Sequence, residues 1–337
     1  MSDTLGIIGA GAFGTALADV VAQQGTTVWI DTADEADARA INETHRHEKR
    51  LPGVKLSPRV RATADVAEVA ANARLLILAV TSRRAREVVL QLASAVDGRH
   101  AIVHAIGALV EDGHGDAAEV QMVRVSELVR AETAVRRIGV LAGPGLAWDL
   151  VERRPAALIV ASPFDELVTT AQRVLSAPPA LRVYGTSDLA GAEVASALGG
   201  AFTLGLGLAD GLDVGPGPRA LFITRAIAEG ARLATAAGGE ALTMTGLAGL
   251  GNVLARSSPG TSDRSDDYQL GLAIGRGAPV AGVRHSEGSR TVPSLLRLAE
   301  RLGTRVPILR ALHAAVHEGL PMQKVIGKLL ESHAEVE

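Results

Sequence analysis

Three glycines near the N-terminus have the spacing of a phosphate-binding turn. Gly9, Gly11 and Gly14 follow a short apolar run, Leu5–Ile8, and open an apolar segment that extends to about Gln23. In the order strand, turn, helix, Gly9 allows the tight turn, Gly11 lets a pyrophosphate approach the backbone, and Gly14 lets the helix pack against the strand. The free N–H groups of the helix then face the phosphates. We predict dinucleotide binding here, with a purely structural turn as the alternative.

A single carboxylate follows the next apolar run. Thr27–Ile30 is a second predicted strand that ends in Asp31, about 20 residues beyond the turn. A carboxylate in this place accepts hydrogen bonds from both ribose hydroxyls. We therefore predict that Asp31 binds the ribose of the dinucleotide.

The composition limits the class of protein. The chain has 337 residues, 47% hydrophobic and 2% aromatic, which gives room for two domains whose cores consist of Ala, Val, Leu and Ile. A net charge of −3 offers no basic field for nucleic acid, and the absence of cysteine excludes disulfides and thiolate chemistry. The acidic N-terminus does not resemble a secretory signal. We predict a soluble cytoplasmic protein without membrane insertion or a nucleic-acid partner.

Apolar runs alternate with helical patterns up to about residue 186. This alternation predicts an α/β fold with a doubly wound, mostly parallel sheet. The predicted strands after the first two are Leu75–Val80, Ala101–Ile106, Ile138–Leu141, Ala156–Ala161 and Leu181–Tyr184. The predicted helices after the first are Ala33–Asn42, Asp65–Asn72, Arg83–Ala95 and Phe164–Ala177.

From residue 187 onward the apolar periodicity is helical. Leu189–Leu208 is long and nearly uncharged, but Glu193 and several glycines favour a core helix over a membrane span. Further helices are predicted at Arg219–Ala237, Ala241–Leu254, Tyr268–Gly275, Val292–Leu302, Pro307–Glu318 and Met322–Ser332. We predict a dinucleotide-binding domain at 1–186 and an all-helical substrate and dimerisation domain at 187–337.

Two groups of histidines have spacings that can ligate a metal. One is His45-Arg46-His47-Glu48 in the polar loop Glu43–Pro58, and the other is His313 and His317 on one helix. Neither group has an evident further ligand. We predict no metal site, a solvated basic loop for the first group and surface or packing histidines for the second.

A set of short motifs extends across the chain from about residue 5 to 330. After the glycine turn they are Leu51-Pro52-Gly53, Ala62-Thr63, Ala79-Val80-Thr81-Ser82, Gly143-Pro144, Arg182-Val183-Tyr184, Asp210-Gly211-Leu212, Ile223-Thr224-Arg225, Gly246-Leu247-Ala248-Gly249-Leu250-Gly251, Glu287-Gly288 and Val306-Pro307-Ile308. In this order they resemble the NAD(P)-dependent glycerol-3-phosphate dehydrogenase family. The resemblance implies a Rossmann-type N-terminal domain, a helical C-terminal domain, a cleft where nicotinamide meets substrate, a homodimer and a role in glycerophospholipid metabolism.

The same resemblance assigns the cofactor contacts. They are Gly9, Gly11, Ala12, Phe13, Gly14, Asp31, Val80, Ser82, Ala147 and Glu287. The family often carries an arginine two positions beyond the end of the second strand, where it meets a 2′-phosphate. This chain has Ala33 there, and Asp31 would repel such a phosphate. We therefore predict NAD rather than NADP.

The substrate half departs from the family. At the positions of the family's two active-site lysines this chain has Ile106 and Gly199. At the position of the aspartate in the family's Gly-Leu-Gly-Asp motif it has Asn252. Ketone reduction needs a donor where alkoxide charge develops, and an ammonium is both proton source and counter-charge. Isoleucine and glycine cannot replace it. We predict an altered substrate site.

The positions for substrate phosphate have changed as well. The family's Ser-Arg-Asn triplet aligns with Ser265-Asp266-Asp267 or Ser262-Asp263-Arg264, and carboxylates there would repel a phosphate dianion. The family's Gly-Pro-Ser/Thr turn is Gly143-Pro144-Gly145 in this chain. The asparagine that the family has before the arginine is replaced by Gly217, while the arginine remains as Arg219. The remaining substrate-binding candidates are Gly143, Gly145, Arg219 and Arg256.

Four residues are candidates to replace the lost groups. Asn252, Arg256 and His104 are weak catalytic candidates, and His285 lies in the segment that the family places near the nicotinamide. Arg256 can hold an anion, with a plain surface arginine as the alternative, but its pKa is too high for a general acid. For His104 we expect burial in the sheet rather than a place in the cleft.

Three functional hypotheses follow. The first is a nicotinamide-dependent dehydrogenase or reductase of the family type with an altered small substrate. The second is an ordinary glycerol-3-phosphate dehydrogenase that uses different side chains. The third is an NAD(H)-binding sensor or partner protein without turnover.

Overall fold

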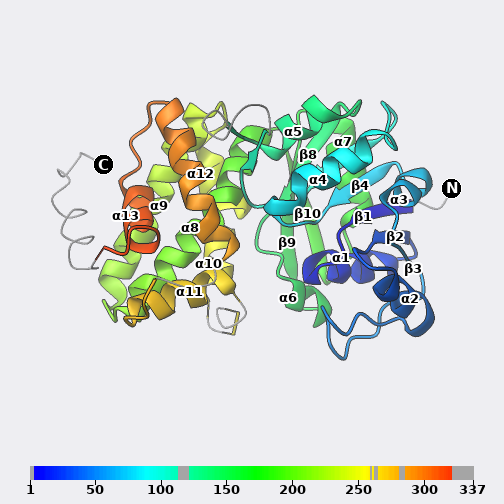
Figure 1. Cartoon of the computed structure of the whole chain (residues 1–337), viewed down its shortest axis with the longest axis horizontal. Coiled ribbons are helices and arrows are strands. Elements are labelled where there is room, and N and C mark those ends of the chain that lie inside the picture. The colour runs from blue at the N-terminus through cyan, green and yellow to red at the C-terminus, as the bar shows by residue number, and fades with distance from the viewer. Residues whose placement is uncertain (1–3, 113–120, 259, 262–264, 281–284, 321–337) are drawn as a thin grey trace. The chain divides into compact units, whose positions relative to one another are not determined.

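A computed structural model describes residues 4–112, 121–258, 260–261, 265–280 and 285–320 (Figure 1). The chain forms two compact units. The first consists of 1–106 and 110–189, and the second of 107–109 and 190–337.

The first unit is built on an eight-stranded sheet. The strands are β1 (Thr4–Ile8), β2 (Thr27–Asp31), β3 (Val60–Thr63), β4 (Leu75–Leu78), β5 (Ala101–His104), β8 (Arg137–Ala142), β9 (Ala156–Ala161) and β10 (Leu181–Thr186). Their order is β10-β9-β8-β5-β4-β1-β2-β3, and every pair is parallel except β8 with β9. The predicted fold class, an α/β protein with a mostly parallel sheet, is confirmed.

Helices flank this sheet. They are α1 (Ala12–Ala22), α2 (Glu35–Thr44), α3 (Val66–Asn72), α4 (Ser82–Ala93), α5 (Val125–Glu132), α6 (Ala147–Val151) and α7 (Asp165–Leu175). Helix α1 packs against α6, while α3, α4 and α5 form another group (Figure 1). A small two-stranded antiparallel sheet, β6 (Val110–Glu111) with β7 (Met122–Val123), was not predicted, and neither were β3, α5 and α6.

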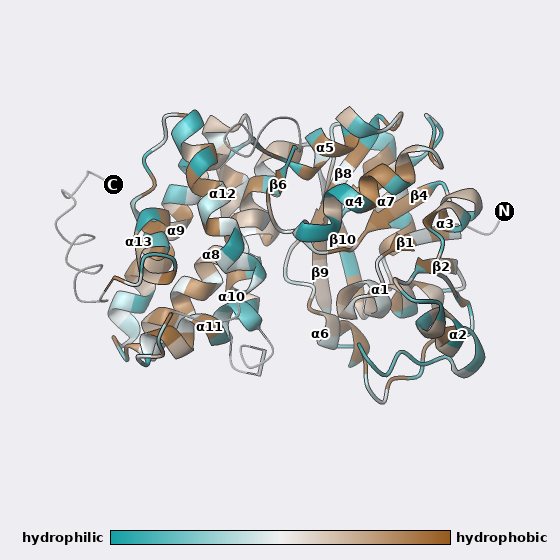
Figure 2. Cartoon of the chain, in the orientation of Figure 1, coloured by the Kyte–Doolittle hydropathy of each residue, from teal (hydrophilic) through white to brown (hydrophobic). Residues whose placement is uncertain are grey.

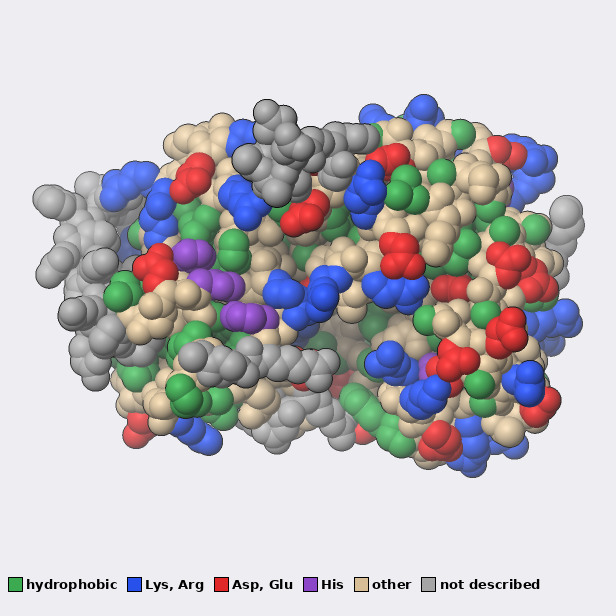
Figure 3. Space-filling view, in the orientation of Figure 1, with side chains coloured by type: hydrophobic (Ala, Val, Ile, Leu, Met, Phe, Trp, Pro, Cys, Tyr) green, Lys and Arg blue, Asp and Glu red, His purple; other side chains and the backbone are tan. Residues whose placement is uncertain are grey.

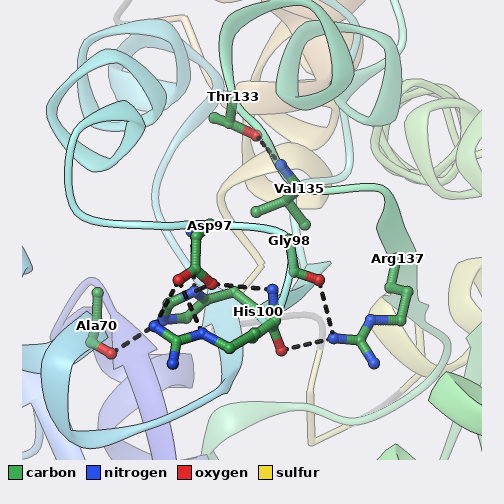
Figure 4. Close-up of polar contacts among 8 residues, drawn as sticks. Ala70, Asp97, Gly98, His100, Thr133, Val135 and Arg137 are labelled. Atoms are coloured by element: carbon green, nitrogen blue, oxygen red, sulfur yellow. Dashed lines mark hydrogen bonds and ion pairs between the residues drawn. The ribbon is translucent and has the colours of Figure 1, made fainter.

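Strand β5, which leads to one of the substituted lysine positions, is fixed at its start by a polar turn. The Asp97 carboxylate accepts from Arg99 Nε at 2.9 Å and lies 3.0 Å from His100 Nδ1 (Figure 4). These partners hold the pKa of Asp97 well below its usual range. His100 Nε2 contacts the Ala70 carbonyl at 3.1 Å, and Arg137 donates to the Arg99 carbonyl at 2.6 Å. The turn is thereby tied to α3 and β8.

The second unit is helical in its described residues. Its elements are α8 (Leu189–Gly211), α9 (Pro216–Ala236), a 3₁₀ helix (Ala241–Thr245), a π-helical turn (Leu247–Gly251), α10 (Asn252–Arg256), α11 (Asp266–Gly275), α12 (Glu287–Arg301) and α13 (Pro307–Val316). Hydrophilic and hydrophobic residues alternate along α12 as on an amphipathic helix (Figure 2). The predicted helix Met322–Ser332 lies outside the described residues.

One predicted helix, Ala241–Leu254, is wrong. The segment consists of three short pieces, and Gly246 between the first two has an extended backbone. A Cβ at Gly249 would overlap the carbonyl of Met244, so the backbones of the first two pieces pack directly against each other. Helix α12 begins at Glu287 instead of Val292, because the Ser286 hydroxyl accepts from the backbone N–H of Ser289.

Helix α8 is the core of the second unit. It is long and apolar enough to cross a membrane, but 89% of its most apolar window is buried inside the protein. Its glycines allow very close packing: a Cβ at Gly207 would overlap the Tyr268 carbonyl, and a Cβ at Gly271 of α11 would overlap the Leu204 carbonyl. This contact agrees with the expected core helix.

Candidate active site

The glycine turn connects β1 to α1 as predicted. Gly9 has a φ of +110°, and a Cβ there would lie 2.6 Å from the Ala79 carbonyl oxygen. A Cβ at Gly14 would overlap the Gly9 carbonyl. Gly11 differs from both, because no atom lies within 4 Å of its ideal Cβ and its φ of −69° is open to any residue.

The protein itself therefore gives no steric reason for a glycine at position 11. Gly11 is the N-cap of α1 and makes no side-chain hydrogen bond to the first N–H groups of the helix. Open space at a helix N-terminus, bordered by uncapped N–H groups, fits a pyrophosphate. The backbone of Gly11, Ala12 and Phe13 thus fits the phosphates of a dinucleotide, while Gly14 lets α1 pack on the Gly9 carbonyl.

Asp31 lies at the end of β2, beside the glycine turn. In the sheet it pairs with Ile8, the last residue of β1, and Ile8 pairs on its other side with Leu78 of β4. Asp31 is 6% exposed. Burial raises its pKa to about 6, although Arg84 opposes the shift, so this carboxylate ionises close to neutrality.

The loop after β4 joins the same group. A Cβ at Gly9 would lie 2.8 Å from Cγ1 of Val80, and Ser82 is the first residue of α4. The ends of β1, β2 and β4 thus bring Gly9, Asp31 and Val80 to one edge of the sheet, as a dinucleotide-binding fold requires.

His47 contradicts the prediction of a solvated loop. It is 4% exposed, and its Nε2 lies 3.0 Å from the carbonyl of Ala10 in the glycine turn. Burial lowers its pKa, so the ring is neutral at physiological pH and carries its proton on Nε2 to donate to this carbonyl. This role of His47 could not be predicted from the sequence, because its partner is 37 positions away. His47 holds the turn in place.

The segment after β8 has its own packing constraints. Gly143 has a φ of +118°, and a Cβ at Gly145 would lie 2.7 Å from Cδ2 of Leu158. The family's serine or threonine at position 145 would therefore collide with Leu158 as packed here. Ala147 is the first residue of α6, which packs on α1.

The two substituted lysine positions offer no ionisable group. Gly199 lies in the middle of α8, and an ideal Cβ there would lie 2.6 Å from Nδ2 of Asn252. The family's lysine and aspartate positions thus face each other, occupied by glycine and asparagine. Ile106 is 3% exposed. His104, a weak catalytic candidate, is 1% exposed on β5, which agrees with the expected burial in the sheet.

The two arginines predicted to bind substrate are each paired with a carboxylate. Arg219 Nε lies 2.9 Å from Asp210 Oδ1, and Tyr268 donates to the other oxygen of Asp210 at 2.7 Å. Burial and the Asp210 carboxylate raise the pKa of Tyr268 to about 12. Arg256 Nη2 lies 3.4 Å from Asp267 Oδ2. The positive charge expected for a substrate anion is balanced by the chain itself at both places.

The remaining site predictions fall at the start of α12. Glu287 is its first residue and pairs with Arg290 at 2.9 Å. His285 stacks on His317, with ring centroids 5.1 Å apart, and His317 stacks on His313 at 5.0 Å; Figure 3 shows histidines in a row on this face. Stacked rings do not direct their nitrogens to one point, and no metal-binding group occurs among the described residues.

A mostly parallel sheet with an intact dinucleotide turn, accompanied by a helical unit, is typical of dinucleotide-dependent oxidoreductases. Residues 4–168 match the family model described as NAD-dependent glycerol-3-phosphate dehydrogenase N-terminus, and residues 188–327 match the corresponding C-terminus. The chain belongs to the NAD-dependent glycerol-3-phosphate dehydrogenase family.

Individual relatives agree with this assignment. The chain is 33% identical to glycerol-3-phosphate dehydrogenase [NAD(P)+] of Bacillus licheniformis, over 96% of this chain and 93% of that protein. It is 34% identical to the enzyme of that name from Streptomyces coelicolor, over 98% and 97%. The crystal structure of glycerol-3-phosphate dehydrogenase from Coxiella burnetii has a TM-score of 0.87 and 26% identity, over 98% of this chain and 99% of that chain. The predicted family and the oxidoreductase class are confirmed, and the comparisons support an enzyme over a binding protein without turnover.

Proposed function

We propose that this chain transfers hydride between NAD(H) and a small hydroxy or keto compound, with a substrate site that differs from that of a typical glycerol-3-phosphate dehydrogenase. The observation that carries the proposal is the contrast between the cofactor-binding half of the site and its substrate half. Gly11 keeps open the space for a pyrophosphate, whereas Gly199 faces Asn252 where the family resemblance places a lysine and an aspartate.

The chain's residues divide the work as follows. When bound, the nicotinamide cofactor would supply or accept the hydride. The glycine turn would hold its pyrophosphate, and Asp31 would accept from its ribose hydroxyls. The Asn252 amide, which faces Gly199, donates to the substrate oxygen and orients it. In the direction of ketone reduction, the substrate oxygen becomes an alkoxide that needs a proton. Because an amide does not give up its proton, the alkoxide takes its proton from water, and we expect slow turnover.

The proposal also covers the domain boundaries, the oligomeric state and the cellular location. We propose a dinucleotide-binding domain at 1–186 and a helical domain at 187–337, supported by family-model matches that end at 168 and begin again at 188. We also propose a homodimer, for which the exposed Leu221, Leu242 and Leu254 of the second unit are candidate interface residues. The bacterial relatives support a cytoplasmic location.

The cofactor preference can be tested directly. We expect the protein to bind NADH at least about tenfold more tightly than NADPH, because the Asp31 carboxylate repels a 2′-phosphate. Asp31→Asn should remove most of that difference. Asp34→Asn is the matched control, because Asp34 is an exposed helix N-cap whose function asparagine preserves. Tighter binding of NADPH by the wild type would contradict the role of Asp31.

The same titration has an expected pH dependence. Because the pKa of Asp31 is raised to about 6, the carboxylate gains its charge as the pH rises from about 5 to about 7. A charged acceptor binds the ribose hydroxyls more strongly than a neutral one, so affinity for NADH should rise roughly fivefold over this range. Asp31→Asn should show a flat profile.

A further inference from the structure

The buried carboxylate of Asp267 has a backbone N–H and an arginine as its partners. Its Oδ1 accepts from the backbone N–H of Gly288 at 2.7 Å, and its Oδ2 lies 3.4 Å from Nη2 of Arg256. Gly288 is the second residue of α12, so the N–H belongs to a helix N-terminus. Asp267 itself is 3% exposed.

This carboxylate lies against the part of α8 that carries the substituted lysine position. A Cβ at Gly200 would lie 3.0 Å from Asp267 Oδ2 and 2.8 Å from Cα of Gly288. The preceding residue, Gly199, faces Asn252 on α10, which also carries Arg256. Four helices, α8, α10, α11 and α12, therefore converge on Asp267. It belongs to the substrate half rather than to a separate structural feature.

The charge of the Asp267 carboxylate affects which ligands can bind beside it. A helix N-terminal N–H and a guanidinium are the donors with which proteins bind phosphate or carboxylate groups of ligands. Here the Asp267 carboxylate accepts from the N–H and forms an ion pair with Arg256. A phosphate dianion that approached this place would meet a carboxylate with its donors already engaged, and like charges at short range in a buried site repel strongly.

We infer that Asp267 is a specificity-determining residue that supplies the site with its own anion, so that the substrate is an uncharged small hydroxy or keto compound rather than a phosphorylated one. The inference rests on the proposed function, because it concerns the substrate of the same nicotinamide-dependent reaction. It differs from a purely structural role for Asp267, which would leave substrate choice unaffected.

Asp267→Asn separates these roles. Asparagine keeps an oxygen that accepts from the Gly288 N–H and has nearly the same volume, but it removes the negative charge and releases Arg256. Glu300→Gln is the matched control, because Glu300 is an exposed carboxylate near the other end of α12 and its loss changes the net charge equally.

The experiment compares NADH oxidation with dihydroxyacetone and with dihydroxyacetone phosphate. For the wild type we expect kcat/KM to favour the uncharged ketone at least tenfold. Asp267→Asn should shift this ratio at least tenfold toward the phosphorylated ketone, and Glu300→Gln should leave it unchanged. A wild type that prefers the phosphorylated ketone would overturn the inference and leave the proposed function intact.

Binding of inorganic phosphate to the NADH-loaded protein provides a measurement independent of turnover. Asp267→Asn should bind inorganic phosphate at least tenfold more tightly than the wild type or Glu300→Gln. Equal binding by all three proteins would overturn the inference, even if neither ketone is reduced. If Asp267→Asn does not fold, the wild-type ratio decides alone. Failure of the wild type to bind NADH would instead reject the proposed function.

Discussion

Replacement of Gly11 by valine is expected to abolish NADH binding while the protein remains folded. The backbone at Gly11, with φ −69° and ψ 177°, is one that valine adopts readily, and no atom lies within 4 Å of the new Cβ. The added side chain therefore costs the fold little. It fills the space in which the pyrophosphate must touch the backbone, so affinity should fall by about 100-fold or more.

Thermal unfolding with and without NADH measures this effect. A ligand that binds only the native state raises its stability by mass action, so the wild type should show a clear increase in Tm at millimolar NADH and Gly11→Val should show none. Gly98→Val is the matched control, because Gly98 also has open space around its Cβ and lies in a turn outside the site. An undiminished NADH shift in Gly11→Val would contradict the assignment of the turn.

Restoring the ionisable groups is expected to produce the largest gain in rate. The variant Gly199→Lys, Ile106→Lys, Asn252→Asp supplies an acid, a second cation and a carboxylate partner for the new lysine. Gly199→Lys alone should do little, because it supplies neither the second cation nor the carboxylate partner and these groups act as a unit. For the triple variant we expect reduction of dihydroxyacetone phosphate to rise about 100-fold over the wild type.

The gain should appear in kcat rather than in KM, because a general acid acts in the transition state. The control replaces position 199 with methionine and keeps the other two substitutions, which adds similar bulk without the ammonium. If the methionine control gains as much as the lysine variant, proton donation from position 199 is not what the wild type lacks. Circular dichroism of both variants verifies that they are folded.

The sequence predicted most of the sheet because its inner strands are uninterrupted apolar runs. β3 was missed because it is a four-residue edge strand in which the exposed Arg61 interrupts the pattern. The segment Ala241–Leu254 has a helical composition, but close backbone contacts, such as Gly249 against Met244, accompany its division into short pieces. Such contacts depend on tertiary packing and are invisible to periodicity.

The cofactor half of the site could be predicted from local sequence, whereas the contacts of the substrate half depend on tertiary packing. The glycine turn could be predicted because its chemistry lies within six consecutive residues. The partners of His47 and Arg219 could not, because Ala10 and Asp210 are selected by the fold and not by spacing along the chain. The pairing of Arg256 with Asp267 likewise joins two helices. An arginine read from sequence as an anion-binding candidate is therefore already neutralised in the structure.

The most direct measurement is the wild-type turnover with NADH and dihydroxyacetone phosphate. Without an ammonium at positions 106 and 199, the rate should be lower than that of a typical enzyme by at least the general-acid contribution, about 10² to 10⁴-fold. Weak phosphate binding beside Asp267 should bring it close to background. A turnover in the ordinary range of roughly 1 to 10³ s⁻¹ would contradict the altered substrate site and show that other groups donate the proton.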